Sequence, residues 1–239
     1  MSAAIDIVKR LLPPRAVVLA RCLTRGLPVP RWGNLRRVKP FSAYYGFERG
    51  TPVDRYYLDR FLESHRDDIS GDVLEIQGSG YTTRYGRGVR RADTVDIAPQ
   101  FSATYTCDLA ASEGVIPSDA FDCFLLPNTL SVLRDLEGCL RQALRIVRPG
   151  GTILGTAAVL CQLQRDGGDY WRMSPEGWRV VAERAWPGCE VSVTSYGNCL
   201  TATAAIMGIA LEELTPAELD VQDPQFPVLV GLRCRKARV

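Results

Sequence analysis

The stretch Gly71-Asp-Val-Leu-Glu-Ile-Gln-Gly-Ser-Gly-Tyr81 decides the fold that this sequence predicts. It is a short apolar run, typical of a buried strand, that ends in a loop of small residues. A second apolar segment, Thr94-Val-Asp-Ile97, carries the acid Asp96 near its end. In α/β sheets such a loop lets the backbone approach a ligand, and a carboxylate at the tip of the next strand binds ribose hydroxyls. Together the two segments predict a nucleoside pocket. The alternative is a buried strand, a turn and an unrelated aspartate.

The same loop argues against a cofactor held by its phosphates. A dinucleotide fingerprint requires Gly-x-Gly-x-x-Gly, but the third position after Gly78 and Gly80 is Thr83. The chain also lacks the Gly-Lys-Ser/Thr of a nucleoside triphosphate site. An adenosine ligand without phosphates fits better, and the commonest such cofactor is S-adenosylmethionine.

Size and composition indicate a globular enzyme. The chain has 239 residues, 46% of them apolar, and a net charge of +2. No run of about 18 apolar residues predicts a membrane-spanning helix. Pro13-Pro14 and several arginines interrupt the apolar pieces near the N-terminus, which argues against a signal peptide. We therefore expect a cytoplasmic protein.

Cysteine and histidine usage excludes several chemistries. The eight cysteines form no Cys-x-x-Cys pair, so we expect reduced core residues and no metal site. His65 is the single histidine and lies in a charged helical segment, which argues against a Ser-His-Asp hydrolase triad.

Positive charge is concentrated at the start of the chain. Residues 1–40 carry nine Lys/Arg against Asp6, a net +8 that leaves −6 for the remainder. Residues 1–50 are expected to form a helical or irregular basic arm. Such an arm contacts anionic lipid, nucleic acid or an acidic partner, or it is a solvated extension that balances the acidic body, which is the interpretation favoured by sequence.

The rest of the chain alternates between strand and helix patterns. Strands are expected over 72–77, 93–97, 103–107, 121–127, 151–159, 190–195 and 227–235, and helices over 54–62, 136–147 and 175–186, with 81–85 a loop or short helix. This alternation predicts an α/β fold with a largely parallel sheet covered on both faces. Residues 198–226 interrupt it as a lid-like insertion, with a helical pattern over 201–214 and a second helix start at Thr215-Pro216.

Several segments, taken in order, resemble class I S-adenosylmethionine-dependent methyltransferases. These are Val73-Leu-Glu-Ile-Gln-Gly-Ser-Gly80, Val95-Asp-Ile97, Cys107-Asp-Leu109, and Phe121-Asp-Cys-Phe-Leu-Leu followed by Leu144-Arg-Ile-Val-Arg-Pro-Gly-Gly-Thr-Ile-Leu154. Outside this core, Phe47-Glu-Arg-Gly-Thr-Pro-Val-Asp-Arg-Tyr-Tyr57, Gly168-Asp-Tyr-Trp-Arg172 and Ser195-Tyr-Gly-Asn198 are similar to a bacterial subgroup often linked to glycosyltransferases. The resemblance implies a Rossmann-like methyltransferase domain over 51–239.

The resemblance also implies roles for individual residues. The cofactor would be bound by Tyr56, Glu75, Gln77, Gly78, Ser79, Gly80, Asp96, Ile97, Asp108, Leu109 and Asn128. Of these, Asp96 would take the ribose hydroxyls, Asp108 the adenine amine, and Asn128 would line the methyl-transfer site. The family's usual loop has glycines where this chain has Gln77, Ser79 and Tyr81.

Methyl transfer to a hydroxyl requires alignment and a base. With Asn128 at the transfer site, Asp169 and Tyr170 are the candidates for catalysis because they lie in a loop at the carboxyl edge of the sheet. The alternative for Asp169 is a structural pairing with Arg172. For the acceptor, Arg172, Tyr196 and Asn198 are the expected binding residues.

The expected function is methylation of an oxygen on a sugar or glycosylated bacterial metabolite, with a glycosyltransferase as an implied partner. A methyltransferase-like binding or scaffold protein that has lost catalysis is one alternative. A nucleic-acid methyltransferase is less favoured, since Pro127-Asn128 has the residues of a target-base motif in the wrong order. Of the partners named for the arm, weak membrane-surface contact stays open and nucleic acid is not expected.

Overall fold

The computed structural model describes residues 13–99, 102–164 and 168–238. The chain divides into two compact units between Lys39 and Pro40, ahead of the boundary expected after residue 50. Within the first unit, the described residues form helix α2 (Pro14–Thr24) and a short 3₁₀ helix, Gly33–Leu35. No helix in the described part of the chain is long and apolar enough to span a bilayer.

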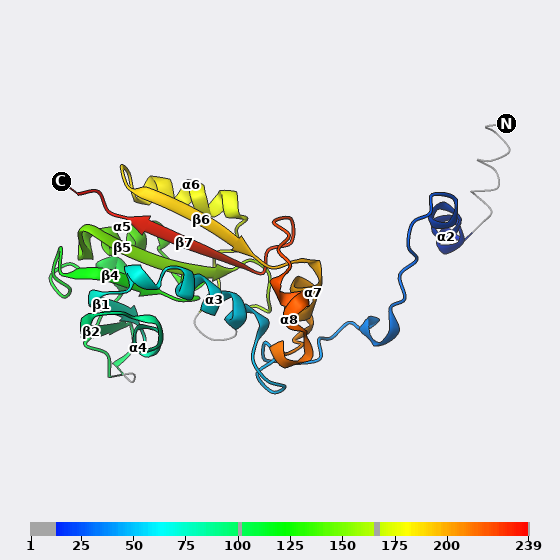
Figure 1. Cartoon of the computed structure of the whole chain (residues 1–239), viewed down its shortest axis with the longest axis horizontal. Helices are drawn as coiled ribbons and strands as arrows, with labels where there is room; N and C mark the ends of the chain where they lie inside the picture. The colour runs from blue at the N-terminus through cyan, green and yellow to red at the C-terminus, as the bar shows by residue number, and fades with distance from the viewer. Residues whose placement is uncertain (1–12, 100–101, 165–167, 239) are drawn as a thin grey trace. The chain divides into compact units, whose positions relative to one another are not determined.

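The second unit is built on a seven-stranded sheet with the order β3-β2-β1-β4-β5-β7-β6 (Figure 1). The strands are β1 (Gly71–Ile76), β2 (Val89–Asp96), β3 (Tyr105–Thr106), β4 (Phe121–Leu126), β5 (Val147–Ala158), β6 (Glu190–Tyr196) and β7 (Leu229–Arg235). Neighbouring strands run parallel except at β7, which is antiparallel to both β5 and β6. The predicted α/β, Rossmann-like fold is confirmed.

Helices cover both faces of this sheet because the central strands are apolar on both sides. They are α3 (Val53–Ser64), α4 (Gly80–Tyr85), α5 (Leu136–Ile146), α6 (Pro175–Ala185), α7 (Cys199–Met207) and α8 (Pro216–Asp220). Phe124 of β4 belongs to the hydrophobic cluster that includes α5 and α6, whereas its neighbour Leu125 belongs to the cluster of α3, α4, α7 and α8. The strand alternation therefore divides the core into two layers of side chains.

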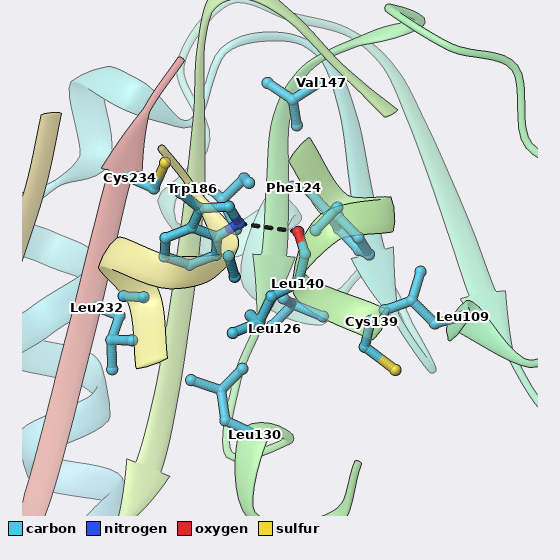
Figure 2. Close-up of a cluster of buried hydrophobic side chains, with 14 of the residues drawn as sticks. Leu109, Phe124, Leu126, Leu130, Cys139, Leu140, Val147, Trp186, Leu232 and Cys234 are labelled. Atoms are coloured by element: carbon cyan, nitrogen blue, oxygen red, sulfur yellow. Dashed lines mark hydrogen bonds between the residues drawn. The ribbon is translucent and has the colours of Figure 1, made fainter. Parts of the chain in front are cut away.

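The tryptophans of the 171–186 segment belong to the α5–α6 side of the core. Trp178 and Trp186 are almost completely buried. Figure 2 shows the Trp186 indole, whose Nε1 donates to the Leu140 carbonyl at 2.8 Å. Trp171 is only partly buried and donates from Nε1 to the Leu133 carbonyl at 2.6 Å. The two buried rings have no surface on which a sugar could stack.

Residues 40–52, here called the strap, connect the N-terminal side of the second unit to the segment around α7. The Phe41 N–H donates to the Met207 carbonyl at 2.7 Å, and Pro52 forms a β-bridge with Ala210. Between these points, the Thr51 hydroxyl donates to the Glu212 carboxylate at 2.7 Å. The strap therefore fixes the entry of α3 relative to α7.

Three elements differ from the sequence expectation. The strand expected from residue 93 begins at Val89, and the strand expected from 151 begins at Val147, with a register shift along the Arg-Pro-Gly-Gly segment. The helical pattern over 201–214 is interrupted at Gly208, which has a φ of 64° and ends α7. The helix start at Thr215 is as predicted, because the Thr215 hydroxyl accepts from the Glu218 N–H.

Candidate active site

The carboxyl ends of the parallel strands bring the predicted cofactor residues to one edge of the sheet. Ile76 of β1 is level with Val95 of β2, so Gln77, which follows β1, lies at the same height as Asp96, the last residue of β2. Asp96 is in turn level with Thr106 of β3, two residues before Asp108. Ligands of open α/β sheets bind at this edge.

Glu75 holds the loop between β1 and α4 in shape. Its buried carboxylate accepts from the Tyr81 N–H at 3.1 Å and from the Thr82 N–H and hydroxyl, each at 2.7 Å. These donors belong to the first turn of α4, where backbone N–H groups lack helical partners. Burial raises the pKa of Glu75, although the hydrogen bonds oppose that shift. Glu75 therefore stabilises the turn from the loop into α4.

In the loop between β1 and α4, the left-handed backbone conformation falls on a non-glycine residue and not on the two glycines. Gln77 has a φ of 71°, in the left-handed region that favours glycine. Gly78 and Gly80 have no such φ, and a Cβ at either would meet no described atom within 4 Å, chain neighbours and helix backbone aside. Neither backbone geometry nor packing within the described chain requires glycine at 78 or 80. The space beside both residues suits a ligand that approaches the backbone.

The two acids at the edge, Asp96 and Asp108, each have one carboxylate oxygen bonded to the backbone two residues on. Oδ1 of Asp96 accepts from the Ala98 N–H at 2.8 Å, and Oδ1 of Asp108 accepts from the Ala110 N–H at 2.9 Å. Among the described residues no hydrogen bond involves the second oxygen of either acid. Ile97 is 72% exposed beside Asp96, whereas Leu109 is buried in the core and supports the edge from below.

Asn128 follows β4 and joins three elements. It has a φ of 48°, its N–H donates to the Thr156 hydroxyl at 2.7 Å, and that hydroxyl donates to Asn128 Oδ1 at 3.0 Å. Asn128 Nδ2 donates to Asp54 Oδ2 at the start of α3, at 2.6 Å. Asn, unlike most residues, tolerates left-handed backbone. The Asn128 side chain therefore links the ends of β4 and β5 to α3.

Asp169 and Arg172 form an ion pair after β5. Arg172 also donates to the Ala158 carbonyl at 3.0 Å, which ties the pair to the end of β5. The Asp169 side chain is only 4% exposed, and its Oδ1 has no hydrogen-bond partner in the described chain. A buried acceptor without a donor is costly, so its presence needs an explanation.

Cys161 and Tyr45 interact electrostatically with the Asp169–Arg172 ion pair. Burial raises the pKa of the Cys161 thiol, Arg172 opposes the shift, and the negative charges of Asp54 and Asp169 add to it. Burial likewise raises the pKa of Tyr45, and Cys161 and Asp169 add to that shift. We call these residues, with Asn128, the polar cluster: Tyr45, Asp54, Asn128, Cys161, Asp169 and Arg172.

Of the remaining predicted residues, Tyr170 is exposed next to Asp169, whereas Tyr56 is already hydrogen-bonded. The Tyr170 ring is 47% exposed on the same loop as Asp169. Tyr56 donates its hydroxyl to Asp220 of α8, beside the Arg60–Asp220 ion pair. These contacts orient Tyr56 toward α8.

Tyr196 and Asn198, expected to bind the acceptor, have structural contacts instead. The Tyr196 ring packs against Tyr57 and Phe61 of α3. Asn198 is 7% exposed and caps α7, accepting from the Thr201 N–H at 3.0 Å. Its Nδ2 donates to the Glu218 and Val221 carbonyls, each at 2.8 Å. Both amide hydrogens are therefore used within the fold, and Asn198 is a capping residue.

Sequence reasoning did not place Tyr45, Asp54, Thr156 or Cys161 in the site. Asp54 and Tyr45 precede β1, and only the folded strap and α3 bring them to the carboxyl edge. The one local signal was the acid in the first turn of a helix that precedes the core. Thr156 and Cys161 lie in or just after an apolar strand, where nothing in the pattern distinguishes them from core residues.

The strand order and the antiparallel β7 define a Rossmann-like α/β architecture. No protein-family model and no curated protein sequence matches the chain. Solved structures of S-adenosylmethionine-dependent methyltransferases share its fold.

A S-adenosylmethionine-dependent methyltransferase from Archaeoglobus fulgidus is 16% identical, with a TM-score of 0.53 over 82% of this chain and 100% of that one. A phosphoethanolamine N-methyltransferase from Haemonchus contortus, solved with S-adenosylmethionine, is 13% identical, with a TM-score of 0.51 over 84% of this chain and 54% of that one. The cyclase SpnF is 17% identical, with a TM-score of 0.50 over 85% of this chain and 88% of that one. At these identities the likeness establishes the fold, and the chemistry has to be argued from the site.

Proposed function

We propose that this protein is an S-adenosylmethionine-dependent methyltransferase that methylates an oxygen atom of a sugar or a glycosylated metabolite. One observation supports this choice of cofactor. Gly78 and Gly80 have open space beside them, and the neighbouring acids Asp96 and Asp108 each have a second carboxylate oxygen without a partner in the described chain. A phosphate-free adenosyl group fits this edge, since the loop offers backbone approach and lacks the third glycine of a pyrophosphate site.

Each group at the edge would have a separate task. Asp96 would accept the ribose hydroxyl hydrogens, and Asp108 the adenine amine. Ile97 offers the adenine an exposed apolar contact. The bound cofactor would supply an electrophilic methyl group, and Asn128 lies at the end of β4, where the resemblance places the methyl-transfer site.

The acceptor would lie on the polar cluster. Displacement at a sulfonium carbon requires the acceptor oxygen in line with the departing sulfur, so rigid positioning matters most. The hydroxyl proton needs a nearby acceptor, and Asp169 Oδ1 is a buried carboxylate oxygen without a donor. A substrate hydroxyl that reached it would satisfy that oxygen while Arg172 holds the other one.

A sugar suits this side of the site for two reasons. In the polar cluster, Asp169 Oδ1 and Arg172 Nε have no hydrogen-bond partner in the described chain and could bond a sugar hydroxyl, and the exposed Tyr170 offers a ring on which a sugar face can stack. The proposed glycosyltransferase partner rests on the sequence resemblance to the bacterial subgroup and is an analogy.

Calorimetry with S-adenosylhomocysteine tests the cofactor proposal. The wild type should bind, and both Asp96→Ala and Gly78→Val should weaken binding at least about tenfold, since a good charged hydrogen bond contributes about 1.5–3 kcal/mol. Asp67→Ala is the matched control, because Asp67 is an exposed acid outside the edge. Circular dichroism would check that each variant is folded. The proposal fails if the wild type does not bind, or if both variants bind like the control.

A binding protein of the same fold without methyl transfer is the second candidate. Two observations favour it: Gln77, Ser79 and Tyr81 replace the family's loop glycines, and the cyclase SpnF shows that this fold also occurs in a protein named for another reaction. Labelled S-adenosylmethionine with a panel of glycosides separates the two. Transfer that is lost in Asp169→Asn supports the enzyme, whereas cofactor binding without transfer to any acceptor supports the binding protein.

A further inference from the structure

The N-terminal unit combines positive charge with exposed apolar side chains. Residues 13–39 contain six arginines and Lys39, and no aspartate or glutamate. Every described residue of this segment is exposed or partly exposed, and helix α2 buries none of its side chains. We call this segment the arm.

The apolar side chains of the arm are large and continue beyond the helix. Leu23 of α2 is 69% exposed, and Trp32 is 56% exposed. Other exposed members are Val18, Leu19, Leu27, Val29, Leu35 and Val38. So many large apolar side chains exposed within one short segment are unfavourable in water, and such a segment usually marks a binding site for a partner.

We propose that the arm binds the surface of an anionic lipid bilayer. Charge complementarity selects the headgroups, since a segment with seven basic and no acidic residues in its sequence is attracted to acidic lipid. The Val and Leu side chains of α2 would enter the boundary between headgroups and acyl chains, as in interfacial helices. Because α2 has 11 residues, it would lie on the surface and not cross it.

Trp32 strengthens the choice of a bilayer over nucleic acid. Trp32 and Leu35 line an open hollow together with Arg36, Arg37, Val38 and Lys39. An indole beside cations is the combination enriched at membrane interfaces, where the ring lies at headgroup level. Nucleic acid would use the cations but would leave the valines and leucines of α2 uncovered.

Vesicle binding by the full-length protein tests the proposal. We expect co-sedimentation with vesicles of phosphatidylcholine and phosphatidylglycerol in equal parts, and not with phosphatidylcholine alone. Tryptophan emission should shift to the blue on binding, and Trp32→Phe should remove the shift without abolishing binding, since Trp178 and Trp186 are already buried and Trp171 packs against the core.

Two pairs of matched variants separate charge from apolar contact. Arg21→Gln with Arg25→Gln should weaken partitioning about tenfold or more, at about 1 kcal/mol per cation. Its control, Arg141→Gln with Arg179→Gln, removes the same charge from helices α5 and α6.

Leu19→Ala with Leu23→Ala should also weaken partitioning about tenfold. Its control, Leu200→Ala with Ile206→Ala, removes exposed apolar groups from α7. Equal binding to neutral vesicles would overturn the proposal, as would arm variants that bind like their controls. If the protein binds an RNA duplex more tightly than vesicles, and the leucine substitutions do not change that binding, the arm is a nucleic-acid-binding segment instead. None of these results depends on cofactor binding.

Discussion

Replacing Gln77 with glycine should stabilise the protein. A non-glycine residue in the left-handed region costs about 1–2 kcal/mol, and Gln77 has a φ of 71°. Glycine would remove that strain but add about 0.5–1 kcal/mol of unfolded-state entropy. Gln77 is exposed, and in the described chain no hydrogen bond involves its side-chain amide. The net gain should be about 0.5–1 kcal/mol, or about 2 °C in Tm.

Urea unfolding with and without S-adenosylhomocysteine measures this gain. The midpoint should rise in Gln77→Gly while the m-value stays constant. Gln77→Ala should leave stability nearly unchanged, because alanine meets the same strain. Ser79→Gly is the opposite control: its φ is −96°, so glycine there adds only entropy and should destabilise. If Gln77→Gly is no more stable than the wild type, or if Ser79→Gly gains as much, the backbone-strain argument is refuted.

Three other substitutions probe separate parts of the fold by unfolding and transfer assays. Glu75→Gln should lower the free energy of unfolding by about 1–3 kcal/mol, because the amide NH₂ would face the backbone N–H donors of Tyr81 and Thr82. Burial raises the pKa of Glu75, so this cost should shrink as pH rises above about 4.5, and a growing cost would contradict it. Although burial opposes it, Arg233 holds the pKa of Asp68 below its usual value. Arg233→Met should therefore cost about 2 kcal/mol at neutral pH, and the cost should vanish in acid as Asp68 protonates. Asn128→Gly should lower methyl transfer roughly tenfold to a hundredfold through loss of the Asp54 contact, while cofactor binding persists; unchanged turnover would remove Asn128 from the site.

Elements fixed by local chemistry were predictable from sequence. The helix at Pro216 follows from Thr215 and Glu218, which satisfy each other's backbone groups within four residues. The end of α7 at Gly208 was not predictable, because the residue that requires glycine there, Ser42, is distant in the sequence. A Cβ at Gly208 would lie 2.7 Å from Ser42 Cβ, so the crossing strap leaves no room for a side chain there. Similarly, the exposed, charged start of β2 is a strand only because it pairs with β1 from Val89 onward.

The cofactor edge of the site was predictable from the sequence, whereas the polar cluster was not. Glu75 lies near the end of β1, Asp96 ends β2 and Asp108 comes just after β3, so the strand topology alone brings these segments to one edge. The polar cluster depends on contacts between remote segments, such as Asn128 with Asp54, which are 74 positions apart. Asn198 had the right position in sequence, but its hydrogen bonds are consumed by the cap of α7.

The position of β7 has a consequence for how the protein is made. This strand lies between β5 and β6, which precede it in the chain, and Gly231 of β7 packs so closely on Phe61 that a Cβ there would clash. During translation, β5 therefore keeps an unpaired edge, and part of α3 an uncovered surface, until residues 229–235 leave the ribosome. Unpaired edges and exposed apolar surfaces of this kind recruit other chains. Nascent chains stalled before residue 229 should therefore depend on chaperones far more than the finished protein does.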